Sequence, residues 1–156
     1  MTVRRAFLVP AAAMLTLTLL GNWNPGKYDP KPDEEIYGIW INDKNYNLNG
    51  FQKTVISADG WKNYTNISDS VPWELGTSQI DSKWTDSEGN IWYKTFGMAT
   101  GGHAKGAKFQ SLTKLSRSLT VMETVTRLRL GEFDSNNYPA EIDPNDDSYA
   151  VYYRAN

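Results

Sequence analysis

The chain has 156 residues and no cysteine, which suggests a single domain and excludes a disulfide framework, a thiolate metal site and thiol catalysis. Its formal net charge of -2 provides no basic field of the kind that binds nucleic acid. Six Trp and nine Tyr in a chain of mean hydropathy -0.56 suit a half-buried sheet surface or a ligand pocket.

The N-terminus has the pattern of a secretory signal peptide. Arg4 and Arg5 precede an apolar run from Ala6 to Leu20, and this run is shorter than the roughly 20 apolar residues that span a bilayer. We therefore expect residues 1–21 to be a signal peptide and the protein to be exported, to the periplasm, the cell surface or the medium. The alternative is an uncleaved anchor, and membrane contact is expected only through this segment. Residues 22–34 are proline-rich and polar, which predicts a disordered N-terminal arm.

From Glu35 onward the sequence contains strand-like runs separated by turn signals, without a convincing helical period. Short connections alternate strictly with long ones. In an up-and-down barrel, alternate loops lie at opposite ends, so this order predicts a cup with a closed base and an open mouth. We therefore predict an all-β domain over residues 35–156, an eight-stranded antiparallel up-and-down barrel. Its expected strands are 35–42, 52–57, 61–66, 77–85, 91–98, 107–115, 119–127 and 148–154.

Two motifs at opposite ends of this domain resemble a known family. Gly38-Ile39-Trp40 at the start of the first strand is similar to the Gly-x-Trp signature of the lipocalin and lipocalin-like proteins. In that family a late arginine packs over the early tryptophan in a cation–π contact, and Arg154 in the last strand matches it. The resemblance covers about residues 35–154. The stretch 131–147, rich in Asn, Asp and Pro, is poorly suited to the helix usual before the last lipocalin strand, so the chain looks like the smaller bacterial lipocalin-like type.

Period-two alternation assigns the lumen side chains if charged residues point outward. It places Trp61, Trp84, Tyr93, Phe109 and Met122 inside, and it places Tyr149, Val151 and Tyr153 on the face opposite Arg154. These rings, with Trp73 as a lid on a mouth loop, are the expected ligand-binding residues. The expected lumen also carries many hydroxyls, which suits a small hydrophobic or amphipathic ligand, or a filled core. Further inward residues are Thr54, Ile56, Asn63, Thr65, Ile80, Ser82, Ile91, Thr95, Ser111, Thr113, Leu115, Thr124 and Thr126.

No pattern in the sequence makes a specific case for catalysis. His103 is the only histidine and lies in a glycine-rich loop that lacks the ending of a phosphate-binding loop. The acidic run 143–147 lacks the spacing of a calcium loop. We expect no catalytic residue, metal or cofactor, no nucleic acid partner, and a monomeric binding protein. One alternative is a β-sandwich carbohydrate-binding or surface adhesion module with Trp73, Trp92 and Tyr152 in a row on an open face. Another is a surface protein whose long loops bind a second protein.

Overall fold

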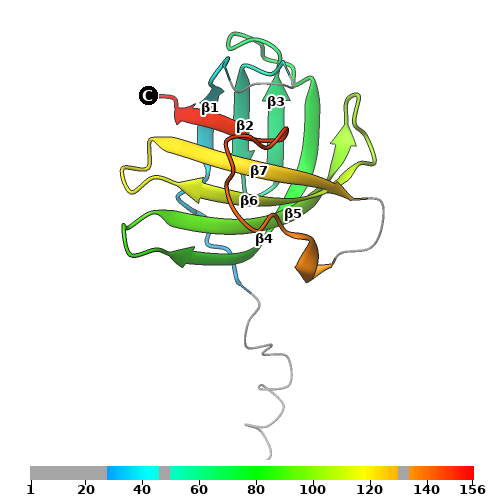
Figure 1. The fold of residues 1–156 in the computed structure, drawn as a ribbon. Coiled ribbons are helices and arrows are strands. Elements are labelled where there is room, and N and C mark those ends of the chain that lie inside the picture. Colours follow the sequence, from blue (N-terminus) through cyan, green and yellow to red (C-terminus); the bar gives the residue numbers. More distant parts are fainter. Residues whose placement is uncertain (1–27, 46–49, 130–133) are drawn as a thin grey trace, which may run out of the picture.

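The computed structural model describes residues 28–45, 50–129 and 134–156, which form one barrel (Figure 1). The only helical element among them is a short 3-10 turn, η2 (Ser135–Asn137). No helix in the described part of the chain is long and apolar enough to cross a membrane. The strands are β1 (Gly38–Asn42), β2 (Lys53–Ser57), β3 (Gly60–Tyr64), β4 (Glu74–Thr85), β5 (Ile91–Gly101), β6 (Lys108–Leu115), β7 (Val121–Arg129) and β8 (Ala150–Arg154).

The strands pair in chain order, all antiparallel, and β1 closes the barrel by pairing with β8. The predicted eight-stranded up-and-down barrel is therefore confirmed, and the β-sandwich alternative is wrong. Tight turns join β2 to β3, β4 to β5 and β6 to β7, and they lie at the same end as the N-terminal segment. This end is called the base, and the opposite end is called the mouth.

A compact apolar core fills the base of the barrel. Trp40, Tyr93 and Leu115 are completely buried there, and Met122 is almost so. They come from four different strands and face inward by their strand registers. Ile36, which precedes β1, completes this cluster from below. The base is thus a packed core and not a channel.

A β-bulge in β4 changes which side chains face the lumen. Ile80 pairs with Thr95, but the next pair joins Ser82 to Lys94, so Asp81 is an extra residue on β4. The extra residue reverses the alternation beyond it. Lys83 consequently pairs with Tyr93 on the inner face, while Ser82 and Trp84 face outward.

The prediction that Trp84 and Ser82 line the lumen is therefore wrong. Trp84 pairs with Trp92 on the outer wall, and 40% of it is exposed to solvent. Strict alternation fails here because it assumes an unbroken ladder. The three residues around the bulge, Asp81, Ser82 and Lys83, are all polar, so no hydrophobic signal marks the change of face.

The last strand also differs from the expected arrangement. Arg154 pairs with Trp40 and faces inward, whereas Val151 and Tyr149 join Val125 in an apolar cluster on the outer wall. The assignment of Tyr149, Val151 and Tyr153 to the lumen is thus wrong. That assignment assumed that charged side chains point outward, but the inward Arg154 guanidinium donates hydrogen bonds to three backbone carbonyls.

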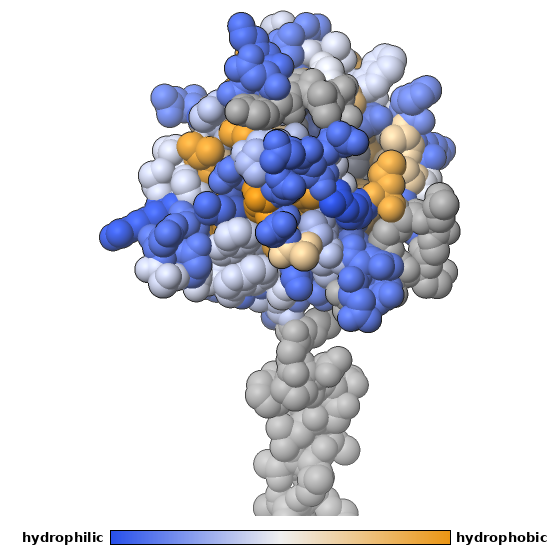
Figure 2. Space-filling model, viewed as in Figure 1, coloured by the Kyte–Doolittle hydropathy of each residue, from blue (hydrophilic) through white to orange (hydrophobic). Residues whose placement is uncertain are grey.

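The segment of residues 134–149, which precedes β8, lies against the outer wall, where it crosses the barrel (Figure 1). Ile142 of this segment packs on the Val125 cluster. The completely buried Gln110 donates from Nε2 to the carbonyl of Asp134 at 2.8 Å, which ties η2 to β6. Figure 2 shows apolar side chains at the centre of this face, bordered by hydrophilic ones. The outer wall therefore carries a second, covered apolar surface.

Residues 28–34 pack over the base, in contrast to the disordered arm predicted for residues 22–34. Glu34 is 2% exposed, and its carboxylate accepts hydrogen bonds from the Tyr28 hydroxyl and from the backbone N–H of Lys31. Proline content alone suggested a tether, but contacts of the buried Glu34 carboxylate with Tyr28, Lys31 and Lys83 order this stretch. Residues 22–27 and the expected signal peptide 1–21 lie outside the described residues.

Removal of residues 1–21 is expected to leave a folded barrel of nearly unchanged stability. All described contacts begin at Tyr28, so a chain starting at Asn22 retains the full base. A chain starting at Ile36 should melt at a lower temperature, because it lacks the Glu34 and Tyr28 contacts. Thermal melts followed by circular dichroism compare the two. An unfolded Asn22 chain would contradict the signal-peptide hypothesis.

Candidate functional site

Two aromatic rings, Trp61 and Phe109, meet in the mouth half of the lumen. Their centroids are 5.9 Å apart at an interplanar angle of 67°, an edge-to-face pair. Each ring lies against a glycine of the barrel wall. A Cβ at Gly76 would lie 2.6 Å from the Trp61 ring, and one at Gly97 would lie 2.7 Å from the Phe109 ring. The glycines thus allow these rings to lie close to the wall.

Hydroxyls line the wall beside these rings and are bonded in pairs between strands. Thr113 and Thr124 are joined at 3.0 Å, and Ser111 and Thr126 at 2.9 Å. On the other side of the barrel, Thr54 donates to the side-chain oxygen of Asn63 at 2.9 Å. The pairing orders these polar groups without a ligand. Each hydroxyl oxygen still has a lone pair to offer.

Solvent reaches the mouth half of the lumen. In a closed barrel, water contacts an inward side chain only through an open end. Trp61, Phe109 and Thr126 face inward and are half-buried, whereas Trp40 and Tyr93 are fully buried. The lumen is therefore packed at its base and accessible at its mouth.

Two buried polar atoms on inward-facing residues have no hydrogen-bond partner in the described part of the chain. They are the donor Nε1 of Trp61 and the acceptor Oδ1 of Asn42. A buried polar atom without a partner costs free energy, so it favours any ligand that can supply one.

The predicted lumen residues are only partly brought together. Trp61 and Phe109 are in contact at the mouth, as expected. Tyr93 and Met122 belong to the packed base. Trp73 lies on the mouth loop, where it is 58% exposed and its backbone N–H donates to the carbonyl of Asn63. The structure thus reduces the candidate lumen site to the Trp61–Phe109 pair and the hydroxyls beside it.

The three signature residues do meet. The Arg154 guanidinium carbon lies 4.4 Å from the centroid of the Trp40 ring. Its nitrogens donate to the carbonyls of Leu119 at 2.7 Å, Tyr37 at 3.0 Å and Glu35. Gly38 has φ +147°, and a Cβ there would lie 2.8 Å from Arg154 Nη1. Glycine is therefore required where the guanidinium crosses the first strand.

A charged cluster lies beside this contact at the base. Lys83, turned inward by the bulge, pairs with Glu34 at 2.7 Å and with Glu35. The Tyr93 hydroxyl donates to Glu35 at 3.0 Å. The Lys83 hydrogen bond lowers the pKa of Glu35 to about 2, and burial together with Glu35 raises the pKa of Tyr93.

Glu34 and Lys83 of the same cluster shift each other's pKa. Burial opposes the ionisation of Glu34, but hydrogen bonds from Lys83, Tyr28 and the Lys31 backbone outweigh it, and its pKa is lowered. Burial likewise disfavours the charged form of Lys83, yet the two carboxylates raise its pKa. All three groups are thus held in their charged forms, which fixes the N-terminal segment to the barrel.

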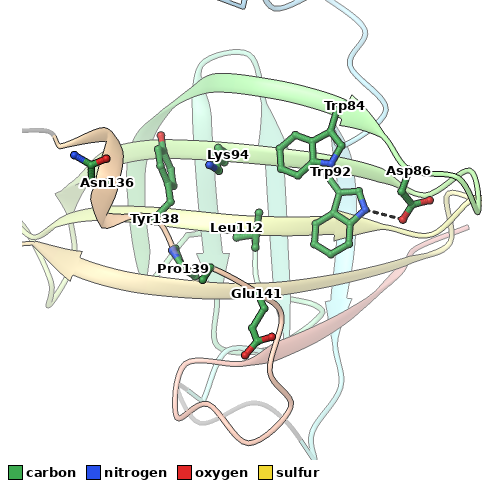
Figure 3. Close-up of a pocket in the computed structure, with 10 residues that line it drawn as sticks. Trp84, Asp86, Trp92, Lys94, Leu112, Asn136, Tyr138, Pro139 and Glu141 are labelled. Atoms are coloured by element: carbon green, nitrogen blue, oxygen red, sulfur yellow. Dashed lines mark hydrogen bonds between the residues drawn. The ribbon is translucent and has the colours of Figure 1, made fainter.

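A groove of about 630 Å³ lies on the outer wall, between β4–β6 and the segment after η2 (Figure 3). Trp84 and Trp92 lie at one end of it and Tyr138 at the other, with Lys94 and Leu112 between them. Pro139 and Glu141 form the opposite wall. The sequence does not predict this groove, because residues 136–141 have no periodicity and the polar residues 81–83 carry no signal of the bulge.

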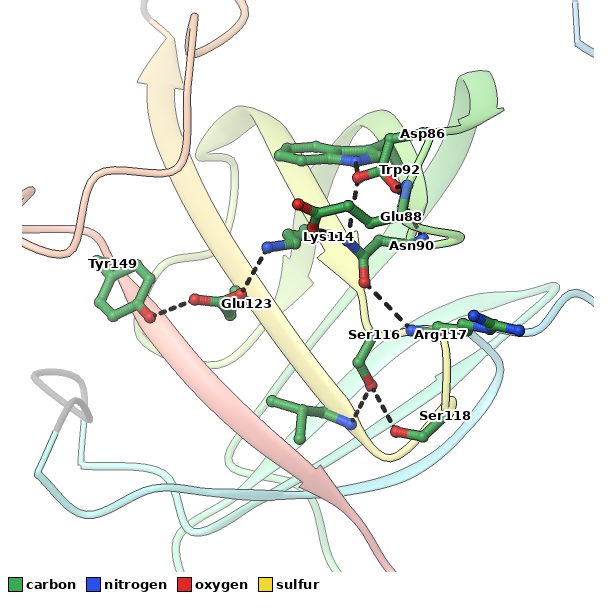
Figure 4. Close-up of polar contacts among 11 residues, drawn as sticks. Asp86, Glu88, Asn90, Trp92, Lys114, Ser116, Arg117, Ser118, Glu123 and Tyr149 are labelled. Atoms are coloured by element: carbon green, nitrogen blue, oxygen red, sulfur yellow. Dashed lines mark hydrogen bonds and ion pairs between the residues drawn. The ribbon is translucent and has the colours of Figure 1, made fainter.

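Trp84 and Trp92 form an ordered aromatic pair. Their planes are almost parallel, at 8°, with centroids 5.9 Å apart, so the stack is offset. Trp92 Nε1 donates to Asp86 Oδ2 at 2.8 Å (Figure 4). This bond, with the bonds from Asn90 and from the backbone, lowers the pKa of Asp86 to about 2. Trp92 is therefore held in place from the β4–β5 turn.

Cations already cover two of the rings around the groove. The Lys94 ammonium lies 5.3 Å from the centroid of Tyr138, and the Lys114 ammonium lies 5.8 Å from that of Trp92. Lys114 also pairs with Glu123 at 3.6 Å, and Glu123 accepts from the Tyr149 hydroxyl at 2.7 Å (Figure 4). The outer wall thus combines aromatic faces with both signs of charge.

Comparisons with protein-family models, with curated proteins and with solved structures give no match. Among the described residues, no group of three or more His, Cys, Asp or Glu side chains is arranged to hold a metal ion.

Proposed function

We propose that the protein is an exported, monomeric and non-catalytic lipocalin-like binding protein, which holds a small amphipathic ligand in the mouth half of its lumen. The observation that carries this proposal is the division of the lumen into a packed base and a solvent-accessible, aromatic and hydroxylated mouth. Eight-stranded barrels of this size accommodate either side chains or one small ligand. Here side chains occupy the base and leave the mouth accessible.

The chemistry of the mouth half favours an amphipathic ligand over a fully apolar one. The edge-to-face pair of Trp61 and Phe109 offers apolar surface to one part of the ligand. The unpaired Trp61 Nε1 and the hydroxyls of Thr124 and Thr126 offer hydrogen bonds to another part. A pocket that is mainly apolar with a few placed polar groups is typical of small-molecule sites.

The assignment to the lipocalin-like family rests on two further observations. Strand order and closure are those expected for the family, and Gly38, Trp40 and Arg154 make the contact that the resemblance implies. Export is proposed from Arg4, Arg5 and the apolar run that follows them.

A titration of the chain starting at Asn22 tests the lumen site. The probes are fatty acids, retinoids and sterols, and the signal is tryptophan fluorescence. We expect saturable quenching with Kd on the order of micromolar, because ordering of the mouth loops opposes binding. Ser78 faces inward opposite Gly97, so Ser78→Phe should fill the mouth half and abolish the response.

Thr77→Phe is the matched control, because Thr77 is the adjacent residue and points outward. It should bind like the unmodified domain. Equal loss of binding in both variants would show that the ligand does not bind in the lumen. Failure of every amphipathic probe to quench would contradict the proposed ligand class.

A further inference from the structure

We propose that the groove on the outer wall is a second binding site, separate from the lumen, which takes a neutral saccharide. Three features carry this inference. They are the aromatic pair Trp84–Trp92, of which Trp84 is exposed, the mixed charges around the groove, and the position of the groove between β4–β6 and residues 136–141.

The aromatic pair is the first feature. The bulge at Asp81 turns Trp84 away from the lumen, and 40% of this large side chain remains exposed beside the groove. Bulges often re-aim a side chain near functional sites. Trp92 stacks on one face of the Trp84 indole, and the exposed part of Trp84 is the indole surface open to a ligand. Such a face suits the flat C–H surface of a pyranose ring, because the C–H groups are attracted to the negative face of the indole.

The charges around the groove select the ligand class. The ammonium groups of Lys94 and Lys114 already lie over Tyr138 and Trp92, so they repel a cationic ligand such as a quaternary ammonium. The carboxylates of Asp86 and Glu141 line the same groove and repel an anionic ligand. A neutral ligand with many hydroxyls avoids both repulsions, and it can donate to the Glu141 carboxylate and accept from Lys94.

The arrangement of the lining residues fits an elongated ring compound. Figure 3 places Tyr138 at the far end of the groove from the tryptophan pair, with Leu112 on the floor between them. A groove of about 630 Å³ lies in the size range of small-molecule sites. Because one side is open to solvent, we expect weak binding, with Kd on the order of 0.1–1 mM.

Isothermal titration calorimetry on the full-length chain tests this site. The probes are cellobiose, maltose, lactose and di-N-acetylchitobiose, with choline and galacturonate as charged comparators. We expect saturable heat from at least one neutral disaccharide and none from the charged compounds. Trp84→Ala should weaken that binding at least about tenfold, since aromatic anchors dominate such contacts.

Two controls separate this site from others. Trp73→Ala removes another exposed tryptophan, on the mouth loop, and should leave saccharide binding unchanged. Ser78→Phe, which fills the lumen, should also leave it unchanged, so failure of this proposal and failure of the lumen proposal are distinguishable. No heat from any neutral disaccharide at roughly 10 mM would overturn the proposal, because it lies well above the expected Kd. Equal losses in Trp84→Ala and Trp73→Ala would also overturn it, as would a response to choline or galacturonate alone.

Discussion

Replacement of Trp40 by alanine is expected to lower the free energy of unfolding by about 3–5 kcal/mol, the range for a buried large aromatic side chain. Trp40 is completely buried among the residues of the base core. Its Nε1 donates to the carbonyl of Ile36 at 2.8 Å, so the substitution also removes the partner of that carbonyl. Urea denaturation at neutral pH measures the loss as a shift of the midpoint with an unchanged slope.

Arg154 shares this site, and its loss should be coupled to that of Trp40. Arg154→Ala is expected to cost about 2–3 kcal/mol, because three backbone carbonyls lose a charged donor. Arg154→Lys keeps the charge but cannot reach three carbonyls in one plane, so it should recover only part of the loss.

A double-mutant cycle gives the interaction between the two residues directly. The contact of 4.4 Å between guanidinium and ring predicts a coupling of about 0.5–2 kcal/mol. Strictly additive effects would mean that the two side chains act independently. They would also remove the contact on which the family proposal rests.

Replacement of Lys83 by methionine should destabilise the barrel by about 3 kcal/mol, since it leaves a buried carboxylate without its cation. The side chain of Glu34 is fully buried, and Lys83 is its only charged partner among the described ion pairs. Lys62→Met is the matched control, because Lys62 is exposed on the outer face of β3 and should cost less than about 0.5 kcal/mol. Similar losses in both variants would show that the cluster contributes little.

The pH dependence of stability gives a second measurement on the same cluster. The pKa values of Glu34 and Glu35 are lowered from an ordinary value of 4.5 in the folded state, that of Glu35 to about 2. Their contribution is therefore complete above pH 4.5 and is lost as the pH falls towards 2. The stability gap between the unmodified protein and Lys83→Met should narrow over this range. A difference in stability between the two proteins that stays constant from pH 6 to pH 2 would contradict the stabilising role of these ion pairs.

The strands and their order could be predicted because the signals are local. Runs rich in β-branched and aromatic residues, such as 52–57, are separated by turn residues such as 58–60. The alternation of short and long connections then leaves few topologies, and closure of the barrel brings β1 beside β8. The contact between Trp40 and Arg154 follows from that closure. Export, the ligand and the monomeric state stay predictions.

The candidate sites were predicted less completely, since each depends on the register between strands or on packing. Nothing in the side chain of Asp81 indicates a β-bulge. The bulge is set by the hydrogen-bond pairing of β4 with β5, and it turns Lys83 inward and Trp84 outward. By its sequence context Glu34 belongs to a solvated arm, and only its ion pair with Lys83 shows that it is part of the base.

The sequence by itself determined the all-β content and the order of the strands, because turn residues and β-forming runs act within a few residues. The pairing of the two end motifs then follows from closure of the barrel. Only the tertiary structure decided which tryptophans face the lumen and which face solvent. One extra residue in β4 exchanges the two faces without changing the hydrophobic pattern. The tertiary structure also decided that residues 136–141 form one wall of a groove. Their position depends on contacts between residues far apart in the chain, such as the hydrogen bond from Gln110 to Asp134.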